Sequence, residues 1–278
     1  MVAFQGEAGA YSDEAARELV PGAQTRGCAS FREAFDALLG GEVEAAVLPV
    51  ENSLAGIVQE VNDLLWERPE LRLEREHLYP VVHCLLSVDG PVRQAISHPQ
   101  ALAQCRRWLE RHGIEPIPFH DTAGAARHLA EIRRTGLGAI ASRAAAARYG
   151  LRVVAEGIQD DPSNQTRFAV VRRGDPVRPG DAPAGHKVSL AFAAPHRPGS
   201  LVACLQCFSD RGINLTRLDS RPVPNRPFEY RFYLDFEVGD DPAQAEEALR
   251  ALEEIALQVR LFGAYPAGRA LSEPATLK

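Results

Sequence analysis

Short apolar runs alternate with helical patterns through the first 170 residues of the chain. The apolar runs are of the length and composition typical of strands, and they occupy residues 2–4, 45–50, 81–88 and 138–141. Helical patterns of apolar residues lie between them and begin near Ser12, Ser30, Pro99, Thr122 and Ser142. Alternation of strand and helix at such short spacing indicates an α/β fold.

Three local signals predict where helices begin. Ser12 is expected to cap a helix whose first turn is acidic. Ser30 and Glu33 have the spacing of a capping box, in which each side chain bonds a backbone N–H group at the helix start. Pro99 occupies a first helical position, and the predicted helix presents an apolar face made of Leu102, Cys105, Trp108 and Leu109.

A segment rich in proline, glycine and aspartate, residues 174–185, interrupts this pattern and is predicted to be an interdomain linker. The segments after it predict strands at residues 188–193, 215–220, 228–236 and 259–262, with helices beginning at Leu201 and Pro242. From Phe228 to Phe236, apolar and polar residues alternate with the period of a half-buried strand. The resulting β-α-β-β-α-β order is ferredoxin-like.

The charge balance limits the classes of partner. Lys and Arg total 31 against 37 Asp and Glu, a net charge of −6, so no net basic field favours a nucleic acid. Lysine occurs only at Lys187 and Lys278, so nearly all the positive charge is arginine, which suits anionic substrates. No apolar run approaches the roughly 18–20 residues needed to span a bilayer.

Five cysteines, with no secretory signal at the N-terminus, favour a reducing cytoplasm. Cys204 and Cys207 form a C-x-x-C pair, but an apolar run surrounds them and no second pair exists, so we interpret them as core residues of one helix. The histidines are scattered without the spacing of metal ligands, and no metal site is predicted.

Three polar segments have two open interpretations each. Gly6 and Gly9 precede a helix and either admit an anion to backbone N–H groups or form a plain turn. The run Glu51-Asn52-Ser53 follows a buried strand and is either a ligand site or an ordinary turn. Gln100 and Gln104 lie one helical turn apart, where they hold a polar ligand or, as the residues alone favour, face solvent.

A fourth segment is more distinctive. The polar turn from Asp160 to Asn164 runs into a predicted strand, and Thr166 and Arg167 stand side by side at its start. A hydroxyl next to a permanent cation is a compact way to bind a carboxylate beside a hydrogen-bond donor.

These segments, in this order, resemble those of the prephenate dehydratase family. The matching motifs are Gly6-x-x-Gly9-x-Tyr11-Ser12, Pro49-Val50-Glu51-Asn52-Ser53, His98-Pro99-Gln100-Ala101-Leu102 and Asn164-x-Thr166-Arg167-Phe168. The downstream unit resembles the ACT domain of the same enzymes, through Pro198-Gly199-Ser200-Leu201, Ile213-Asn214-Leu215-Thr216 and Asp219-Ser220-Arg221-Pro222. Ser200 and Asp219 stand where the family usually has Ala and Glu.

The resemblance implies an α/β fold with two lobes facing a cleft, like a periplasmic binding protein, followed by a ferredoxin-like ACT domain. We expect the catalytic domain at residues 1–173, with lobe one at about 1–76 and 160–173 and lobe two at about 77–159. The linker would occupy 174–185, the ACT domain 186–266 and a tail 267–278.

The implied reaction is the decarboxylation and dehydration of prephenate to phenylpyruvate, in L-phenylalanine biosynthesis. Aromatisation drives it, so no redox cofactor or metal is expected. By analogy Thr166 donates to the leaving hydroxyl, and Arg167 binds a substrate carboxylate or organises the site. Further catalytic positions are Asn52, Ser53, Gln104 and Glu51, and the substrate-positioning residues are Tyr11, Ser12, Gln100, Asn164 and Phe168, the last through packing.

The same resemblance implies L-phenylalanine as allosteric effector and a homo-oligomer, a dimer or tetramer, formed through the ACT domains. The expected effector-binding residues are Gly199, Ser200, Leu201, Asn214, Leu215, Asp219, Ser220, Arg221 and Pro222. Two rivals remain. Arogenate dehydratase acts on the same skeleton with an amino group in place of the keto group, and a non-catalytic amino-acid sensor would need no leaving-group donor such as Thr166.

Overall fold

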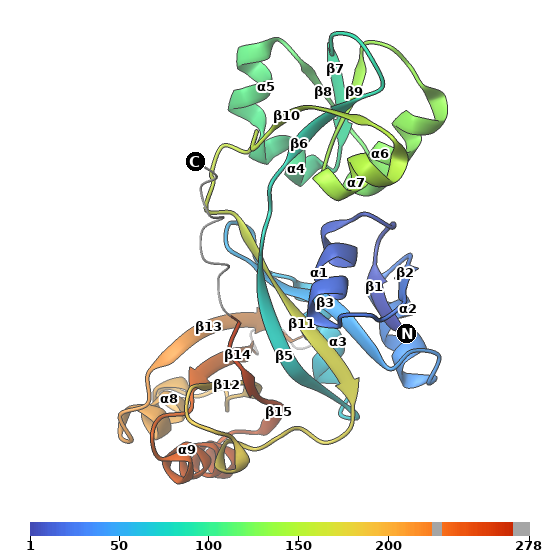
Figure 1. Ribbon diagram of the computed structural model, residues 1–278. Helices are drawn as coiled ribbons and strands as arrows, with labels where there is room; N and C mark the ends of the chain where they lie inside the picture. The colour runs from blue at the N-terminus through green and yellow to red at the C-terminus, as the bar shows by residue number, and fades with distance from the viewer. Residues whose placement is uncertain (224–229, 269–278) are drawn as a thin grey trace. The chain divides into compact units, whose positions relative to one another are not determined.

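The computed structural model describes residues 1–223 and 230–268 (Figure 1). Within these residues the chain forms two compact units, one from residues 1–58 and 78–168 and the other from residues 59–77 and 169–268. The chain passes from one unit to the other inside two strands, β5 (Leu71–Pro80) and β11 (Gln165–Arg173).

The first lobe of the first unit is built on a sheet in which β1 pairs parallel with both β2 and β3. Its strand order is β2-β1-β3-β11-β5, and a short strand, β4, pairs with β3. The bounds of the elements that open this lobe are β1 (Val2–Gln5), α1 (Tyr11–Leu19), β2 (Thr25–Cys28), α2 (Phe31–Leu39), β3 (Ala45–Asn52) and β4 (Gly56–Ile57). Helices α1 and α2 pack on β1 and β3, which explains why those strands are almost wholly apolar.

The capping prediction is confirmed for one helix and wrong for the other. Ser30 caps α2 by accepting a hydrogen bond from the N–H group of Glu33 at 3.1 Å. Ser12 does not cap α1, which begins one residue earlier and has Ala10 as its N-cap. There the carboxylate of Asp13 accepts from the N–H group of Gly9 at 2.9 Å and takes over the capping role.

The second lobe of this unit has a five-stranded sheet in the order β10-β6-β9-β7-β8. Its strands are β6 (Cys84–Ser87), β7 (Gln94–Ser97), β8 (Glu115–Pro118), β9 (Leu137–Ala141) and β10 (Arg152–Glu156). Its helices are α4 (Pro99–Gln104), α5 (Arg106–His112), α6 (Thr122–Ile132) and α7 (Arg143–Tyr149). Both faces of the sheet bury apolar side chains, around Leu86 and Ala139 on one face and around Leu85 and Ile140 on the other.

The helix predicted from Pro99 is in fact two helices that meet at Cys105. The carbonyl of Gln104, which a continuous helix would use internally, accepts instead from the N–H group of Asp160 at 2.7 Å. The carboxylate of Asp160 in turn accepts from the N–H group of Arg107 at 3.2 Å. The loop at Asp160 therefore substitutes for the missing helical bonds and ends α4 at this point.

The strand predicted for residues 81–88 is shorter, because β6 begins only at Cys84. Residues 81–83 belong to one of two chain segments that cross between the lobes, and the N–H group of Val81 bonds the carbonyl of Asn164 in the other crossing at 2.9 Å. Figure 1 shows these two crossings side by side. The apolar run of residues 81–88 therefore contains the end of a segment that crosses between the lobes, followed by the short strand β6.

The second unit contains a four-stranded antiparallel sheet in the order β13-β14-β12-β15. Its elements are β12 (His186–Ala193), α8 (Ser200–Ser209), β13 (Leu215–Pro222), β14 (Tyr230–Glu237), α9 (Pro242–Ile255) and β15 (Gln258–Pro266). The predicted β-α-β-β-α-β order is confirmed. Cys204 and Cys207 lie buried on α8, in the core that the helices form with the sheet, as expected.

Two further segments complete the second unit. The predicted linker contains a short 3-10 turn, η1 (Pro179–Asp181), and Arg178 there bonds Glu246 of α9 at 2.8 Å. Helix α3 (Gln59–Glu67) carries Asp63, whose carboxylate accepts from Arg221 at 2.8 Å. The predicted strand residues Phe228 and Glu229, and all but the first two residues of the predicted tail, lie outside the described residues.

The predicted fold class, α/β with a two-lobed catalytic domain and a ferredoxin-like second domain, is confirmed by this architecture. In the part of the chain that the structure describes, no helix is both long enough and apolar enough to cross a membrane.

Candidate active site

A pocket of about 530 Å³ lies in the first unit and draws its walls from both lobes. Five predicted site residues line it, from four different segments: Tyr11, Asn52, Gln100, Gln104 and Thr166. Gln100 and Gln104, which were weighed as solvent-facing residues, both belong to its wall. Apolar contacts come from residues such as Phe31, Pro49, Ile57 and Val81.

The side-chain amide of Asn52 organises the first-lobe side of the pocket. Its oxygen accepts from the N–H groups of Leu54 and Ala55 at 3.1 and 3.0 Å, which shapes the turn between β3 and β4. Its nitrogen lies 2.9 Å from the side-chain oxygen of Asn164 and 3.0 Å from Oγ1 of Thr166. The amide is saturated by protein partners, so Asn52 positions its neighbours.

The hydroxyl of Thr166 is left with its hydrogen to give. Oγ1 accepts from Nδ2 of Asn52, and no described residue accepts the hydroxyl hydrogen in return. Because Thr166 lines the pocket, that hydrogen is available to a ligand there.

Arg167 and Glu51 lie next to this network but do not line the pocket. The guanidinium of Arg167 is buried and lies 2.9 Å from the carboxylate of Glu51. Of the two roles expected for Arg167, the geometry favours organisation of the site, since its charge is directed to Glu51. The pairing also explains how an acidic residue can stand beside an anion-binding pocket.

The other residues predicted for this site do not line the pocket, and most of them contact the elements that do. Ser53 accepts from the N–H group of Gln165 at 3.0 Å and fixes the end of β3 against β11. Asn164 is almost fully buried, and Phe168 packs edge-on against Tyr79 in the core. Ser12 does not line the pocket, and no contact in the described structure assigns it a role there.

His83 is a pocket residue that the sequence analysis missed. It is only 2% exposed, with Nε2 at 2.9 Å from the side-chain oxygen of Gln104 and Nδ1 at 2.9 Å from the hydroxyl of Tyr11. Burial lowers the pKa of His83, and the bond to Gln104 partly opposes this. Burial also raises the pKa of Tyr11 well above its ordinary value, so the phenol stays protonated. A polar residue inside the apolar run of residues 81–88 was the signal available.

Three of the polar residues that line the pocket lie at the start of helices. Gln100 and Thr122 lie in the first turns of α4 and α6, and Tyr11 begins α1. None of the described residues that line the pocket is an arginine or lysine. An anion there would therefore be held by neutral donors, helix dipoles and histidines, of which His98 and His120 also line the pocket.

The Gly6-x-x-Gly9 turn is not part of an anion loop. The N–H group of Gly6 bonds the carbonyl of Cys28, and that of Gly9 bonds Asp13, so neither is available to a ligand. Gly9 has a φ of 87°, and a side chain there would meet the backbone of Ala145 in α7 at 3.1 Å. Its carbonyl accepts from the hydroxyl of Ser142 at 3.0 Å. The turn is therefore a contact between the lobes.

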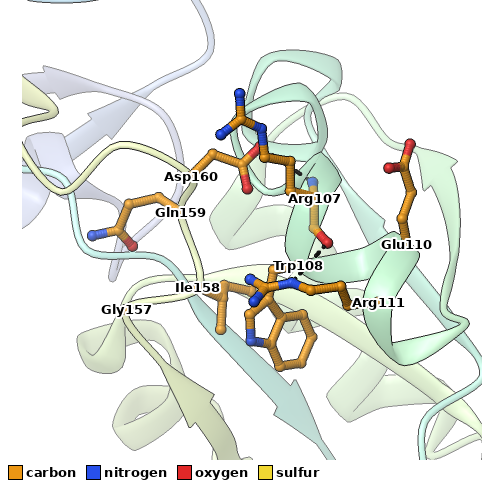
Figure 2. Close-up of a pocket in the computed structure, with 8 residues that line it drawn as sticks. All are labelled: Arg107, Trp108, Glu110, Arg111, Gly157, Ile158, Gln159 and Asp160. Atoms are coloured by element: carbon orange, nitrogen blue, oxygen red, sulfur yellow. Dashed lines mark hydrogen bonds between the residues drawn. The ribbon is translucent and has the colours of Figure 1, made fainter.

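A second pocket, of about 680 Å³, lies in the second lobe (Figure 2). It lies between α5 and residues 157–160 and contains Trp108 with Arg107 and Arg111. None of the predicted site residues lines it. We assign the active site to the smaller pocket because it gathers the predicted donors.

The cysteines and possible metal ligands are not arranged for chemistry. Burial raises the pKa of Cys84 to about 11 and that of Cys105 to about 12, which leaves both as thiols at neutral pH. Over residues 1–223 and 230–268, no three His, Cys, Asp or Glu side chains are grouped so that they could hold a metal ion.

The predicted effector residues of the second unit are not brought together. Ser200 and Leu201 line a pocket of about 410 Å³ beside Tyr230 and Phe232, next to the N-cap Gly199. Asn214 lines a different pocket of about 180 Å³. The remaining positions, Leu215, Asp219, Ser220, Arg221 and Pro222, lie along β13.

Comparison with known proteins identifies the family of the chain. A family model described as prephenate dehydratase matches residues 2–176, and one described as ACT domain matches residues 188–254. Arogenate dehydratase/prephenate dehydratase 2 of Arabidopsis thaliana is 41% identical over 278 residues, which cover 95% of this chain and 72% of that protein.

Two solved structures are similar over almost the whole chain. Prephenate dehydratase from Arthrobacter aurescens in complex with L-Phe is 30% identical with a TM-score of 0.85, covering 100% of this chain and 92% of that one. GqqA, described as a novel type of quorum quenching acylase, is 36% identical with a TM-score of 0.86, covering 96% and 98%. The first family model spans more than half of the chain, and the plant relative is similar along nearly all of it. The chain therefore belongs to the prephenate dehydratase family and carries an ACT domain.

Proposed function

We propose that the protein is a lyase that converts prephenate to phenylpyruvate, with carbon dioxide and water as the other products. The electron pair of the breaking bond to the ring carboxylate enters the ring, and the ring hydroxyl leaves. A leaving hydroxide needs a proton or a strong hydrogen bond in the transition state. The protein must therefore hold a dianion and present a donor to the departing oxygen.

The observation that carries the proposal is the bond from Asn52 to Thr166. Because Nδ2 of Asn52 donates to Oγ1 of Thr166, the hydroxyl hydrogen of Thr166 is directed elsewhere, and Thr166 lines the pocket. A threonine hydroxyl is a weak acid, so we assign it hydrogen-bond stabilisation of the leaving hydroxide, which takes up a proton from solvent and leaves as water. Gln100 and Gln104 supply donors for the carboxylates, Tyr11 donates to the carbonyl of Val82 and supports His83, and Arg167 pairs with Glu51 behind the pocket wall.

We assign the effector role of L-phenylalanine to the ACT domain. The Arthrobacter aurescens relative was solved with L-Phe, and the pocket beside Ser200 combines a helix N-terminus with Tyr230 and Phe232, features that suit the carboxylate and ring of an aromatic amino acid. The predicted positions on β13 would complete this site from a second copy of the chain, in a dimer or tetramer. All five cysteines are free, as suits the reducing cytoplasm in which we expect the protein to act.

The direct test is to add prephenate to purified protein and to follow phenylpyruvate by its absorbance in base, with and without L-phenylalanine. We expect turnover that L-phenylalanine changes. Arogenate is tested in parallel, because several similar plant proteins are named for it, and the ratio of the two kcat/KM values decides between the substrates. Binding of L-phenylalanine without turnover of either substrate would instead identify a sensor.

Acyl transfer is a second candidate, because GqqA is described as an acylase. An acylase of the serine or cysteine type needs a nucleophile beside a base. Ser53 bonds the backbone at Ser163 and Gln165, and the thiols of Cys84 and Cys105 are buried with raised pKa values. The geometry therefore favours the dehydratase, and release of free amine from acylated amines without any phenylpyruvate formation would reverse that choice.

A further inference from the structure

His83 joins the two lobes at the active site and has no role in the proposed reaction so far. It directly precedes β6 at the end of one crossing, and its imidazole is in contact with Tyr11 of α1 and Gln104 of α4. Both ring nitrogens of His83 contact protein side chains, so neither is free to act on a substrate. The ring is instead placed to hold the side chains that it contacts.

The backbones of His83 and Gln104 are fixed by the same short segment, residues 158–160. Ile158 donates to the carbonyl of His83 at 3.1 Å, and the side-chain oxygen of Gln159 accepts from the N–H group of His83 at 3.0 Å. Asp160 donates to the carbonyl of Gln104 at 2.7 Å, the bond that ends α4. These backbone bonds hold His83 and Gln104 at a fixed distance, so the imidazole of one can contact the side-chain amide of the other.

The direction of the Gln104 amide sets the tautomer of His83. The side-chain oxygen of Gln104 only accepts hydrogen bonds, so Nε2 of His83 at 2.9 Å must carry a hydrogen. The amide nitrogen of Gln104 then points away from His83, and no described residue accepts from it. Since Gln104 lines the pocket, its NH2 group is presented there as a donor.

The structure therefore assigns His83 as a positioning residue that holds Gln104 with its NH2 group facing the substrate. This inference rests on the proposed function, because it supplies a donor for a dianion in a pocket whose described lining contains no arginine or lysine. If the amide turned over, its carbonyl oxygen would face the substrate carboxylate and repel it. Nδ1 is then an acceptor, and the single hydroxyl hydrogen of Tyr11 is shared between Nδ1 at 2.9 Å and the carbonyl of Val82 at 2.8 Å, which supports the other side of the ring.

Two substitutions of His83 separate its two contacts. A glutamine amide reaches the position of Nε2, and an asparagine amide reaches only that of Nδ1. We expect His83→Gln to retain kcat/KM within about 3-fold and His83→Asn to lose about 10-fold or more, the cost of an unmet partner at a buried site. Equal losses in the two variants would overturn the assignment. His112→Gln is the matched control, since His112 is exposed and does not line the pocket, and it should leave kcat/KM unchanged.

Substitutions of Gln104 test the direction of its amide. In Gln104→Glu the residue still accepts from His83, but an oxygen replaces the NH2 group in the pocket, whereas Gln104→Met removes both contacts. We expect Gln104→Glu to lose at least as much kcat/KM as Gln104→Met, at least about 10-fold. A Gln104→Glu variant with near-normal kcat/KM would show that the oxygen, not the nitrogen, faces the substrate.

A nuclear magnetic resonance measurement keeps the test independent of turnover and of the folding of any variant. In 15N-labelled wild-type protein at neutral pH, the two-bond correlations of the His83 ring report which nitrogen carries the hydrogen. We expect it on Nε2, and a hydrogen on Nδ1 alone would overturn the assignment. Absence of turnover with prephenate and arogenate, together with an Nε2 hydrogen, would point instead to failure of the proposed function.

Discussion

The active-site pocket and the predicted effector residues differ in how far one chain completes them. In the first unit, residues as distant in sequence as Tyr11, Gln104 and Thr166 line a single pocket. In the second unit, Ser200 and Asn214 line separate pockets, and Asp219 lies on β13 and lines neither of them. We infer that one chain can form the catalytic pocket, whereas the effector site would need a second copy of the chain to bring its parts together.

The largest effect is expected for a substitution in the active-site pocket. Thr166→Ala should lower kcat by roughly 10²-fold or more, because it removes a positioned donor to the leaving group. Thr166→Ser is the matched control, since it keeps the hydroxyl, and it should retain most of the activity. Steady-state assays with prephenate measure both, and near-normal turnover of Thr166→Ala would end the assignment of Thr166.

The effector site, which one chain does not complete, predicts that two different binding-defective variants complement each other in a mixed oligomer. Gly199→Val puts a branched side chain on a backbone with a φ of 83° next to the pocket of Ser200, and Asp219→Ala removes a carboxylate from β13, so each should weaken L-phenylalanine binding by about 10-fold or more. If a site combines parts of two chains, mixed oligomers of the two variants regain intact sites. Calorimetry on a refolded mixture should show a tight-binding fraction that neither variant shows alone. A mixture with no tight sites would place the whole effector site within one chain.

A smaller effect is expected where α3 meets the sheet of the second unit. Asp63 accepts from Arg221 at 2.8 Å and lies 3.4 Å from Arg231, whose guanidinium stacks 4.1 Å from the ring of Trp66. Asp63→Asn should lower the free energy of unfolding by about 1–2 kcal/mol, because charge-assisted bonds at a half-buried site are lost. Urea unfolding measures this, and Asp240→Asn, an exposed residue without such partners, should change it by less than about 0.5 kcal/mol.

The smallest expected effect is a pH dependence from His83. Burial lowers the pKa of His83 in the folded protein, so below the unfolded pKa of about 6.5 the unfolded chain binds more protons than the folded one. The stability contributed by the neutral ring is therefore present above that pH and is lost as the pH falls through the folded pKa. Urea unfolding from pH 7.5 to 5 should show a shallower decline in His83→Gln than in the wild type. Parallel curves would show that His83 titrates normally.

Much of this fold follows from local sequence signals. The alternation of apolar runs and helices, the Ser30–Glu33 capping box and the β-α-β-β-α-β order of the second unit each correspond to a structural element. These signals succeed because hydrophobic period and backbone capping act within a few residues.

Apart from the cap of α1, which Asp13 provides locally, the errors come from long-range contacts. The break at Cys105 depends on Asp160, and the shortened strand β6 depends on the crossing in which Asn164 bonds Val81. His83 had no distinguishing motif, and its role requires Tyr11 and Gln104, which lie 72 and 21 residues away. The family motifs could identify Thr166 and Asn52 as neighbours in function, but not the saturation of the Asn52 amide, which is a property of the folded turn.

The contact at Gly9 has a consequence for the separation of the two lobes. The carbonyls of Ala8 and Gly9 accept from Tyr149 and Ser142 of the opposite lobe, at 2.7 and 3.0 Å, and neither of these donors lines the pocket. If the two lobes separate, these bonds break together with those from Tyr11 to Val82 and His83, whereas the bonds among Asn52, Asn164 and Thr166 can stay intact. Substitution of Tyr149 or Ser142 would therefore change how readily the lobes separate without removing a residue that lines the pocket.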